Sequence, residues 1–157
     1  MLKSALKKLI GLDQSDLTSY GIGLLHTKVY RILKERTEEF LKEHGLSSIE
    51  WAMLGLLYEN KEGLRSSEIA ELLGVEPPFV TELTNKLKKQ AYIESRTSKE
   101  DKRARNITLS AKGRTLVPQV EKNIRNKVRY LVDGASIMQI QSYYHVLKTI
   151  VKNSSDQ

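Results

Sequence analysis

The middle of the chain carries the pattern that most constrains the fold. Two helical segments, 66–73 and 77–90, are separated by a turn at Gly74. Two strand-like runs, 92–97 and 106–109, follow at once and flank a polar, charged tip. A helix-turn-helix followed directly by a β-hairpin is typical of a winged helix. The remaining segments have helical spacing, so we expect a mostly α fold with a small β-hairpin wing and a helical dimerisation region.

The second helix of this pair has one apolar and one polar face. Val80, Leu83 and Leu87 face inward at helical spacing, and a helix of this diameter fits the major groove of duplex DNA. Amide and carboxylate side chains can pair with base edges, and lysines can contact phosphates. The predicted DNA-contacting residues on this helix are Pro77, Pro78, Thr81, Glu82, Asn85, Lys86 and Lys89.

Positive charge is concentrated around this pattern. The chain has a net charge of +7, and residues 76–114 hold ten lysines and arginines against five acidic residues, a net +5. A basic block within a folded module is the pattern of a polyanion binder, although a solvated basic face gives the same count. The basic residues of the hairpin that we expect to contact DNA are Arg96, Lys99, Lys102, Arg103 and Arg105.

Two stretches in this region resemble the MarR family of winged helix-turn-helix regulators. Residues 66–73 read SSEIAELL, and residues 101–114 read DKRARNITLSAKGR, with the D-x-R wing motif and the Ser-x-x-Gly opening of the next helix. The resemblance extends over about residues 20–150 and implies a homodimer, built on terminal helices, that binds a pseudo-palindromic site in double-stranded DNA. It also implies that Arg103 enters the minor groove and that Asp101 supports the wing.

The chain departs from the family pattern at three positions. Glu82 stands where the family often has a basic residue, which weakens phosphate attraction, and Ser95 replaces a frequent wing arginine. Ala91 stands where a glycine commonly ends the recognition helix. A left-handed alanine costs about 1 kcal/mol more than glycine, so we expect a differently built turn there.

The flanking helices indicate how the chain is organised. Tyr20 to His44 reads as one long helix ended by Gly45, and a capping box at Ser47 opens the next. The link 63–65 can form one small strand, Ser66 and Ser110 can cap the helices that they open, and a break at Gly134 separates the last two helices. Apolar stripes on the first and last helices exceed what a winged helix can cover, so we expect a second subunit. The predicted regions are N-terminal dimerisation helices in 1–45, the DNA-binding domain in 46–112 and C-terminal dimerisation helices in 113–157.

Ligand and catalytic sites leave few traces in the sequence. Relatives of the suspected family bind small aromatic ligands between the dimer base and the winged helix, and His26, Tyr30, Trp51 and Tyr58 are the candidates for such an effector pocket. With no cysteine and three scattered histidines, we expect no metal site and no cofactor. We also expect no catalytic residue, because no carboxylate pair, activated nucleophile or phosphate loop appears at usable spacing.

The sequence leaves two functions open. The first is a transcription regulator that acts as a repressor. We expect it in the cytoplasm, because no secretion signal or membrane span is apparent in the sequence. The second is a winged helix that binds an acidic protein partner rather than DNA, which Glu76 and Glu82 on the recognition helix favour. Residues 1–12 are expected to form an amphipathic helix that packs on the dimer rather than on a membrane.

Overall fold

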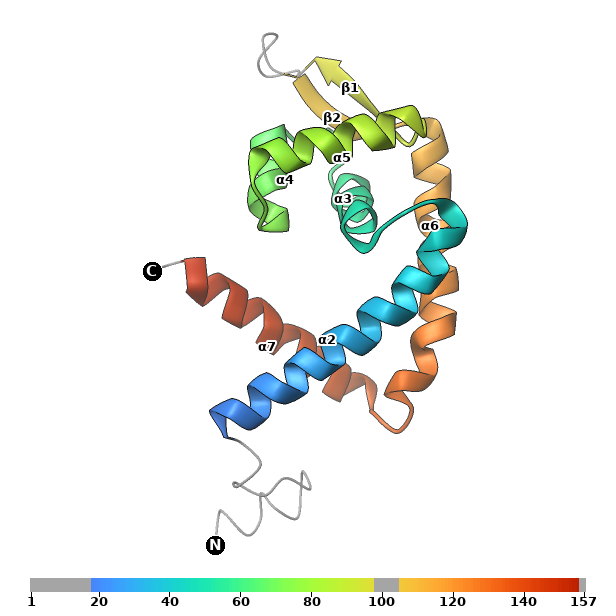
Figure 1. The fold of residues 1–157 in the computed structure, drawn as a ribbon. Coiled ribbons are helices and arrows are strands. Elements are labelled where there is room, and N and C mark those ends of the chain that lie inside the picture. Colours follow the sequence, from blue (N-terminus) through green and yellow to red (C-terminus); the bar gives the residue numbers. More distant parts are fainter. Residues whose placement is uncertain (1–17, 98–104, 156–157) are drawn as a thin grey trace, which may run out of the picture. The chain divides into compact units, whose positions relative to one another are not determined.

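The computed structural model describes residues 18–97 and 105–155 (Figure 1). The fold is mostly α-helical with one two-stranded antiparallel hairpin, as expected from the sequence. The chain divides into two compact units, one up to Ile124 and one from Arg125 onward. The elements are α2 (Ser19–Leu41), a 3₁₀ turn (Lys42–His44), α3 (Ser48–Glu59), α4 (Ser66–Leu73), α5 (Pro77–Lys89), β1 (Ile93–Thr97), β2 (Arg105–Leu109), α6 (Ala111–Val128), a second 3₁₀ turn (Arg129–Val132) and α7 (Ile137–Ser155).

The core of the first unit lies under α3, α5 and the hairpin. α3 has apolar residues at nearly every position, and Met53, Leu54 and Leu57 are fully buried. α5 contributes its inward face, as its apolar spacing predicts. Other buried side chains come from α4, β2 and α6, namely Ile69, Leu109 and Val120. This core fixes the inner side of α5 and leaves its outer side to solvent.

The hairpin has a fixed register and a third short partner. Ile93 pairs with Leu109 at the base, and Thr97 pairs with Arg105 at the end of the described part. Leu64 exchanges both backbone hydrogen bonds with Ile107, at 3.1 and 2.8 Å, so the small strand suggested for 63–65 is limited to an isolated β-bridge. The strands are therefore tied to the segment that precedes α4 as well as to each other.

Most helix ends follow the sequence signals. Ser47 and Glu50 form the expected capping box at the start of α3, and Gly45 takes a left-handed conformation with φ of 66°. Pro77 and Pro78 occupy the first turn of α5. The expectation that Ser66 caps α4 is wrong. Ser66 is already helical, and the Glu68 carboxylate instead accepts a 2.6 Å hydrogen bond from the backbone of the N-cap residue, Arg65.

The end of α5 also differs from expectation. Ala91 has a φ of 60°, so the turn keeps the left-handed geometry that glycine usually provides. The amide of Ala91 donates to the Lys88 carbonyl at 2.9 Å, and the amide of Tyr92 donates to the Leu87 carbonyl at 3.0 Å. This is the Schellman arrangement, and the same pair of bonds closes α4 around Gly74, which has a φ of 64°. The turn is not built differently; it holds an alanine in a conformation that favours glycine.

The second unit consists of the end of α6, the 3₁₀ turn and α7. Gly134, with φ of 87°, separates the two helical segments at the position where the sequence predicted a break. Ser136 caps α7, because its hydroxyl accepts from the amide of Gln139 at 3.3 Å while the Gln139 side chain accepts from the amide of Ser136 at 2.7 Å. Within the described part of α7, Leu147 is half-buried and most other apolar side chains are exposed.

Candidate nucleic-acid interface

The outer face of α5 carries the predicted DNA-contacting residues together. All seven are exposed, and they alternate with the buried side chains of Val80, Leu83, Thr84 and Leu87. Two of the seven are the prolines that begin the helix, and the other five are polar. Asn85 and Lys89 lie close to the middle of the exposed face, opposite the buried stripe. The hairpin follows α5 directly and lies beside it (Figure 1). The polar face of α5 and the basic residues of the strands therefore belong to one packed unit.

The hairpin is described only in part. Arg96 and Arg105 are exposed near the open end of the strands. The Arg96 guanidinium lies 2.6 Å from a Glu94 carboxylate oxygen, so this charge is partly balanced on the strand itself. Lys99, Asp101, Lys102 and Arg103, the predicted tip of the wing, lie outside the described residues.

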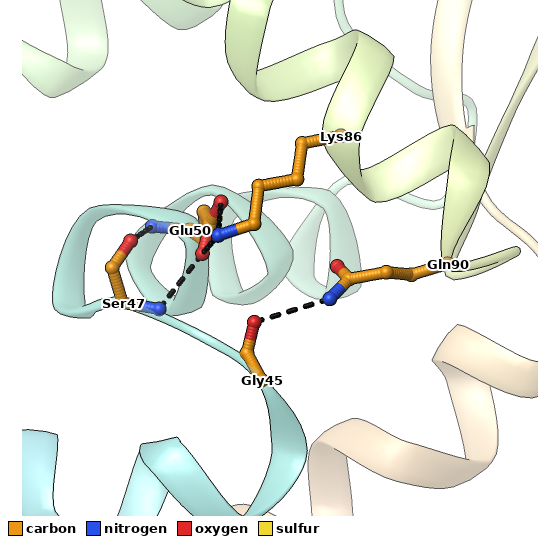
Figure 2. A network of polar contacts seen from close by, with 5 residues as sticks. All are labelled: Gly45, Ser47, Glu50, Lys86 and Gln90. Carbon is orange, nitrogen blue, oxygen red and sulfur yellow. Dashed lines mark hydrogen bonds and ion pairs between the residues drawn. The ribbon is translucent and has the colours of Figure 1, made fainter.

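Lys86 has a partner that the sequence analysis did not find. Its ammonium nitrogen lies 2.7 Å from Oε1 and 2.9 Å from Oε2 of Glu50 on α3 (Figure 2). The Glu50 side chain is only 2% exposed, whereas the Lys86 side chain is 54% exposed. Oε2 of Glu50 also accepts a 2.8 Å hydrogen bond from the backbone amide of Ser47. One buried carboxylate therefore serves both the start of α3 and a cation on α5.

The surroundings of Glu50 change its titration. Burial alone raises the pKa of its carboxyl, but hydrogen bonds from Lys86 and from Ser47, with the charge of Lys86, lower it further than burial raises it. The net result is a pKa below the ordinary value of 4.5, so Glu50 is ionised at neutral pH and its negative charge faces the ammonium.

A second polar contact lies one helical turn further along α5. The side-chain amide of Gln90 donates a 3.1 Å hydrogen bond to the carbonyl of Gly45, in the turn between α2 and α3 (Figure 2). Lys86 and Gln90 are four residues apart and point to the same side of α5. Together they attach one flank of the recognition helix to residues 45–50.

The start of α6 also holds the end of α5, through hydrogen bonds from Lys112 and Ser110. The ammonium of Lys112 donates to the Gln90 carbonyl at 2.9 Å, where a cation also suits the negative end of the helix dipole. Ser110, confirmed as the cap of α6, accepts from the Gly113 amide at 3.1 Å and donates to the Ala91 carbonyl at 2.6 Å. A Cβ on Gly113 would lie 2.1 Å from the Tyr92 carbonyl oxygen. The Ser-x-x-Gly motif thus packs the start of α6 against the end of α5.

The sequence did contain a signal for the buried carboxylate. Glu50 shares its helix face with Met53, Leu54 and Leu57, at the spacing of a buried stripe. An acidic residue in such a stripe requires a positive partner or a set of hydrogen-bond donors. The capping box supplies one donor, and the remaining charge of Glu50 predicts a lysine or arginine partner from another part of the chain.

The four candidate effector residues lie on two helices of the first unit. His26 and Tyr30 are exposed, one turn apart on α2. Trp51 is half-buried near the start of α3, and Tyr58 is 40% exposed near its end. Among the described residues, no ring contact joins any two of these four. A pocket formed by them stays a prediction.

Comparisons with known proteins identify the domain. Residues 44–104 match the model of the MarR family. They are a MarR-family domain. The chain is 23% identical over 130 residues to the HTH-type transcriptional regulator PapX of Escherichia coli, covering 82% of this chain and 79% of that protein.

Solved structures share the fold of this chain. A crystal structure of CouR from Rhodococcus jostii RHA1 bound to p-coumaroyl-CoA is 20% identical, with a TM-score of 0.77 over 82% of this chain and 90% of that one. A crystal structure of an S. aureus MepR–DNA complex is 22% identical, with a TM-score of 0.69 over 83% of this chain and 96% of that one. At these identities the match supports the winged-helix fold and its helical flanks.

The described residues contain neither a membrane span nor a metal-binding cluster. Over residues 18–97 and 105–155, no helix is long and apolar enough to cross a membrane. Within the same residues, no group of three or more histidine and acidic side chains is placed to hold a metal ion.

Proposed function

We propose that the chain is a sequence-specific transcription regulator that binds double-stranded DNA through α5 and the hairpin. The observation that carries the proposal is the outer face of α5, where every predicted contact residue is exposed on a helix whose other side is fixed in the core. Asn85 is suited to pair with an adenine edge, and Lys89 is suited to a phosphate. The MarR-family match and the DNA-bound relative support this assignment.

The wing extends the same interface. Arg96 and Arg105 place two guanidinium groups on neighbouring strands. The proposal assigns the minor groove to Arg103 and a supporting role to Asp101, on the family resemblance. An arginine in a narrow minor groove responds to DNA shape and potential rather than to base identity.

A homodimer is the proposed working form. Ile22, Leu25 and Ile32 on α2 are exposed, and so are Ile137, Ile140 and Tyr144 on α7. Exposed apolar stripes of this extent mark protein interfaces, and a twofold axis would present two recognition helices to a pseudo-palindromic operator. In the proposed mechanism, bound dimer blocks transcription of the regulated gene.

A small-molecule effector completes the proposal. CouR was crystallised with p-coumaroyl-CoA, an aromatic acyl thioester. For this chain we propose an aromatic ligand between α2 and α3, with His26, Tyr30, Trp51 and Tyr58 as the residues to test. The single tryptophan, Trp51, gives a direct readout, because a ligand that stacks on it would quench its fluorescence.

Selection of bound duplexes from a random pool tests the proposal. We expect an enriched sequence with twofold symmetry, and a log–log salt slope of several units for binding to it. Asn85→Ala should relax preference at one position in each half-site, whereas Arg103→Ala should weaken binding severalfold without changing the oligomer. Salt-insensitive binding with no enriched sequence would instead favour a protein-interaction module.

A further inference from the structure

We propose that Glu50 is a positioning residue for DNA recognition, which holds Lys86 to fix the rotation of α5 and keeps that ammonium away from the DNA backbone. The inference rests on the proposed function. It assigns to Lys86 a role different from that of Lys89, although both are exposed lysines on one helix. Sequence alone gives both lysines the same role of phosphate contact.

The geometry around Glu50 supports a firm hold on Lys86. The ammonium lies within 2.9 Å of both carboxylate oxygens, so one cation engages the whole carboxylate (Figure 2). The carboxylate is buried, because only 2% of the Glu50 side chain is exposed. A phosphate that took Lys86 would leave a buried negative charge without its counter-charge, which is strongly unfavourable.

The hold also sets the rotation of α5 about its own axis. Lys86 and Gln90 contact Glu50 and Gly45, respectively, at points one helical turn apart. Two polar attachments on the same flank resist rotation of the helix about its axis more strongly than the buried apolar contacts do alone. Asn85, next to Lys86 in sequence, depends on this rotation to face the groove.

Lys89 provides the contrast. It lies on the exposed face opposite the buried stripe, and none of the ion pairs found within residues 18–97 and 105–155 includes it. Its ammonium is therefore available to a phosphate, whereas that of Lys86 is committed. Each cation that reaches a phosphate releases counterions on DNA binding. Lys89 should therefore contribute to the salt slope, whereas Lys86 should not.

The first experiment compares the two lysines by titration of a random-sequence duplex over a range of salt concentrations. Lys89→Met should lower the log–log slope by about 0.9, the value for one phosphate contact. Lys86→Met should leave the slope unchanged. Trp51 fluorescence and thermal unfolding are used to choose a temperature at which each variant is folded.

The second experiment releases Lys86. Glu50→Gln keeps an acceptor for the Ser47 amide but removes the negative charge. The slope should rise by about 0.9, because the freed ammonium reaches a phosphate. Preference for the selected duplex over a random one should fall severalfold, because α5 is less firmly oriented. Glu59→Gln on the same helix makes an equal change in net charge and should alter neither quantity.

The double variant tests whether the increase in slope in Glu50→Gln comes from Lys86. Glu50→Gln combined with Lys86→Met removes both charges and should return the slope to that of the wild type. A Lys86→Met slope that falls as far as that of Lys89→Met would overturn the inference, as would an unchanged slope in Glu50→Gln. If the wild-type protein itself shows no salt-dependent binding to duplex DNA, the proposed function fails first, which separates the two results.

Discussion

α3 and α7 both carry apolar side chains at helical spacing, but these side chains are buried in α3 and mostly exposed in α7. In α3, Met53, Leu54 and Leu57 have no exposed surface, because the core of the first unit covers them. In α7, Ile137 is 74% exposed and Tyr144 is 63% exposed. Apolar spacing therefore indicates that a helix needs a partner surface, and the structure shows whether the helix's own unit supplies it.

The same contrast applies to what each region can tolerate. A buried side chain is surrounded by close-packed neighbours, so its loss leaves a cavity. An exposed apolar side chain contributes little to the stability of the free chain and matters only where it meets another surface. Substitutions in the two helices should therefore affect different measurements.

Leu57→Ala should have the largest effect on folding. Leu57 is fully buried in α3, and truncation of such a leucine costs about 2–5 kcal/mol. Chemical denaturation followed by Trp51 fluorescence measures the loss, because the only tryptophan lies in the same helix. A cost below about 1 kcal/mol would contradict the packing described for α3.

Ile150→Glu should act on assembly instead. Ile150 is 60% exposed on α7, and a charge placed in an apolar interface should weaken a dimer by at least about tenfold, or about 1.4 kcal/mol. Sedimentation at several concentrations measures the change. Denaturation followed by Trp51 fluorescence at a concentration where both proteins are monomers is the control and should match the wild type. An unchanged oligomer would remove this part of α7 from the proposed interface.

Ala91→Gly should stabilise the winged helix by about 1 kcal/mol, because Ala91 holds a positive φ that glycine adopts without strain. Gly74→Ala is the reverse experiment on the same type of turn. A Cβ at Gly74 would meet no atom within 4 Å, so only the backbone conformation opposes it and a loss of similar size is expected. Thermal unfolding of both variants checks the pair, and equal signs would refute the strain at Ala91.

The smallest effect should come from pH. The folded-state pKa of Glu50 lies below its ordinary value of 4.5, so the stability that its ionised form contributes is present above pH 4.5. That contribution is lost as the pH falls through the lower folded-state pKa. The stability difference between wild type and Glu50→Gln should therefore shrink on acidification. A difference that stays constant would mean that charge plays no part in the hold on Lys86.

The sequence was sufficient for most of the fold because its signals are local. Pro77 and Pro78 mark the start of α5, and Gly45 marks the end of the helical segment before α3. The spacing of Val80, Leu83 and Leu87 predicted the buried face. These features depend on residues a few positions apart, where helix geometry alone decides which side chains share a face.

The features that sequence analysis missed depend on tertiary contacts. Glu50 and Lys86 are 36 residues apart, and only the packing of α5 beside α3 brings them together. At Ala91 the hydrogen bonds of the turn and the bond from Ser110 outweigh the local preference against a left-handed alanine. Ser66 failed as a cap because Glu68 satisfies the helix start from the other direction. The tip of the wing, with Arg103, lies outside the described residues, so its role stays a prediction.

The hydroxyl of Ser110 has a consequence for local motion. It bonds to the Gly113 amide and to the Ala91 carbonyl at once, so fraying of the first turn of α6 also frees the last turn of α5. The two turns should open together and show matched rates of amide hydrogen exchange. Tightening at one helix end would then slow exchange at the other, which gives a spectroscopic measure of how firmly the recognition helix is seated without any DNA present.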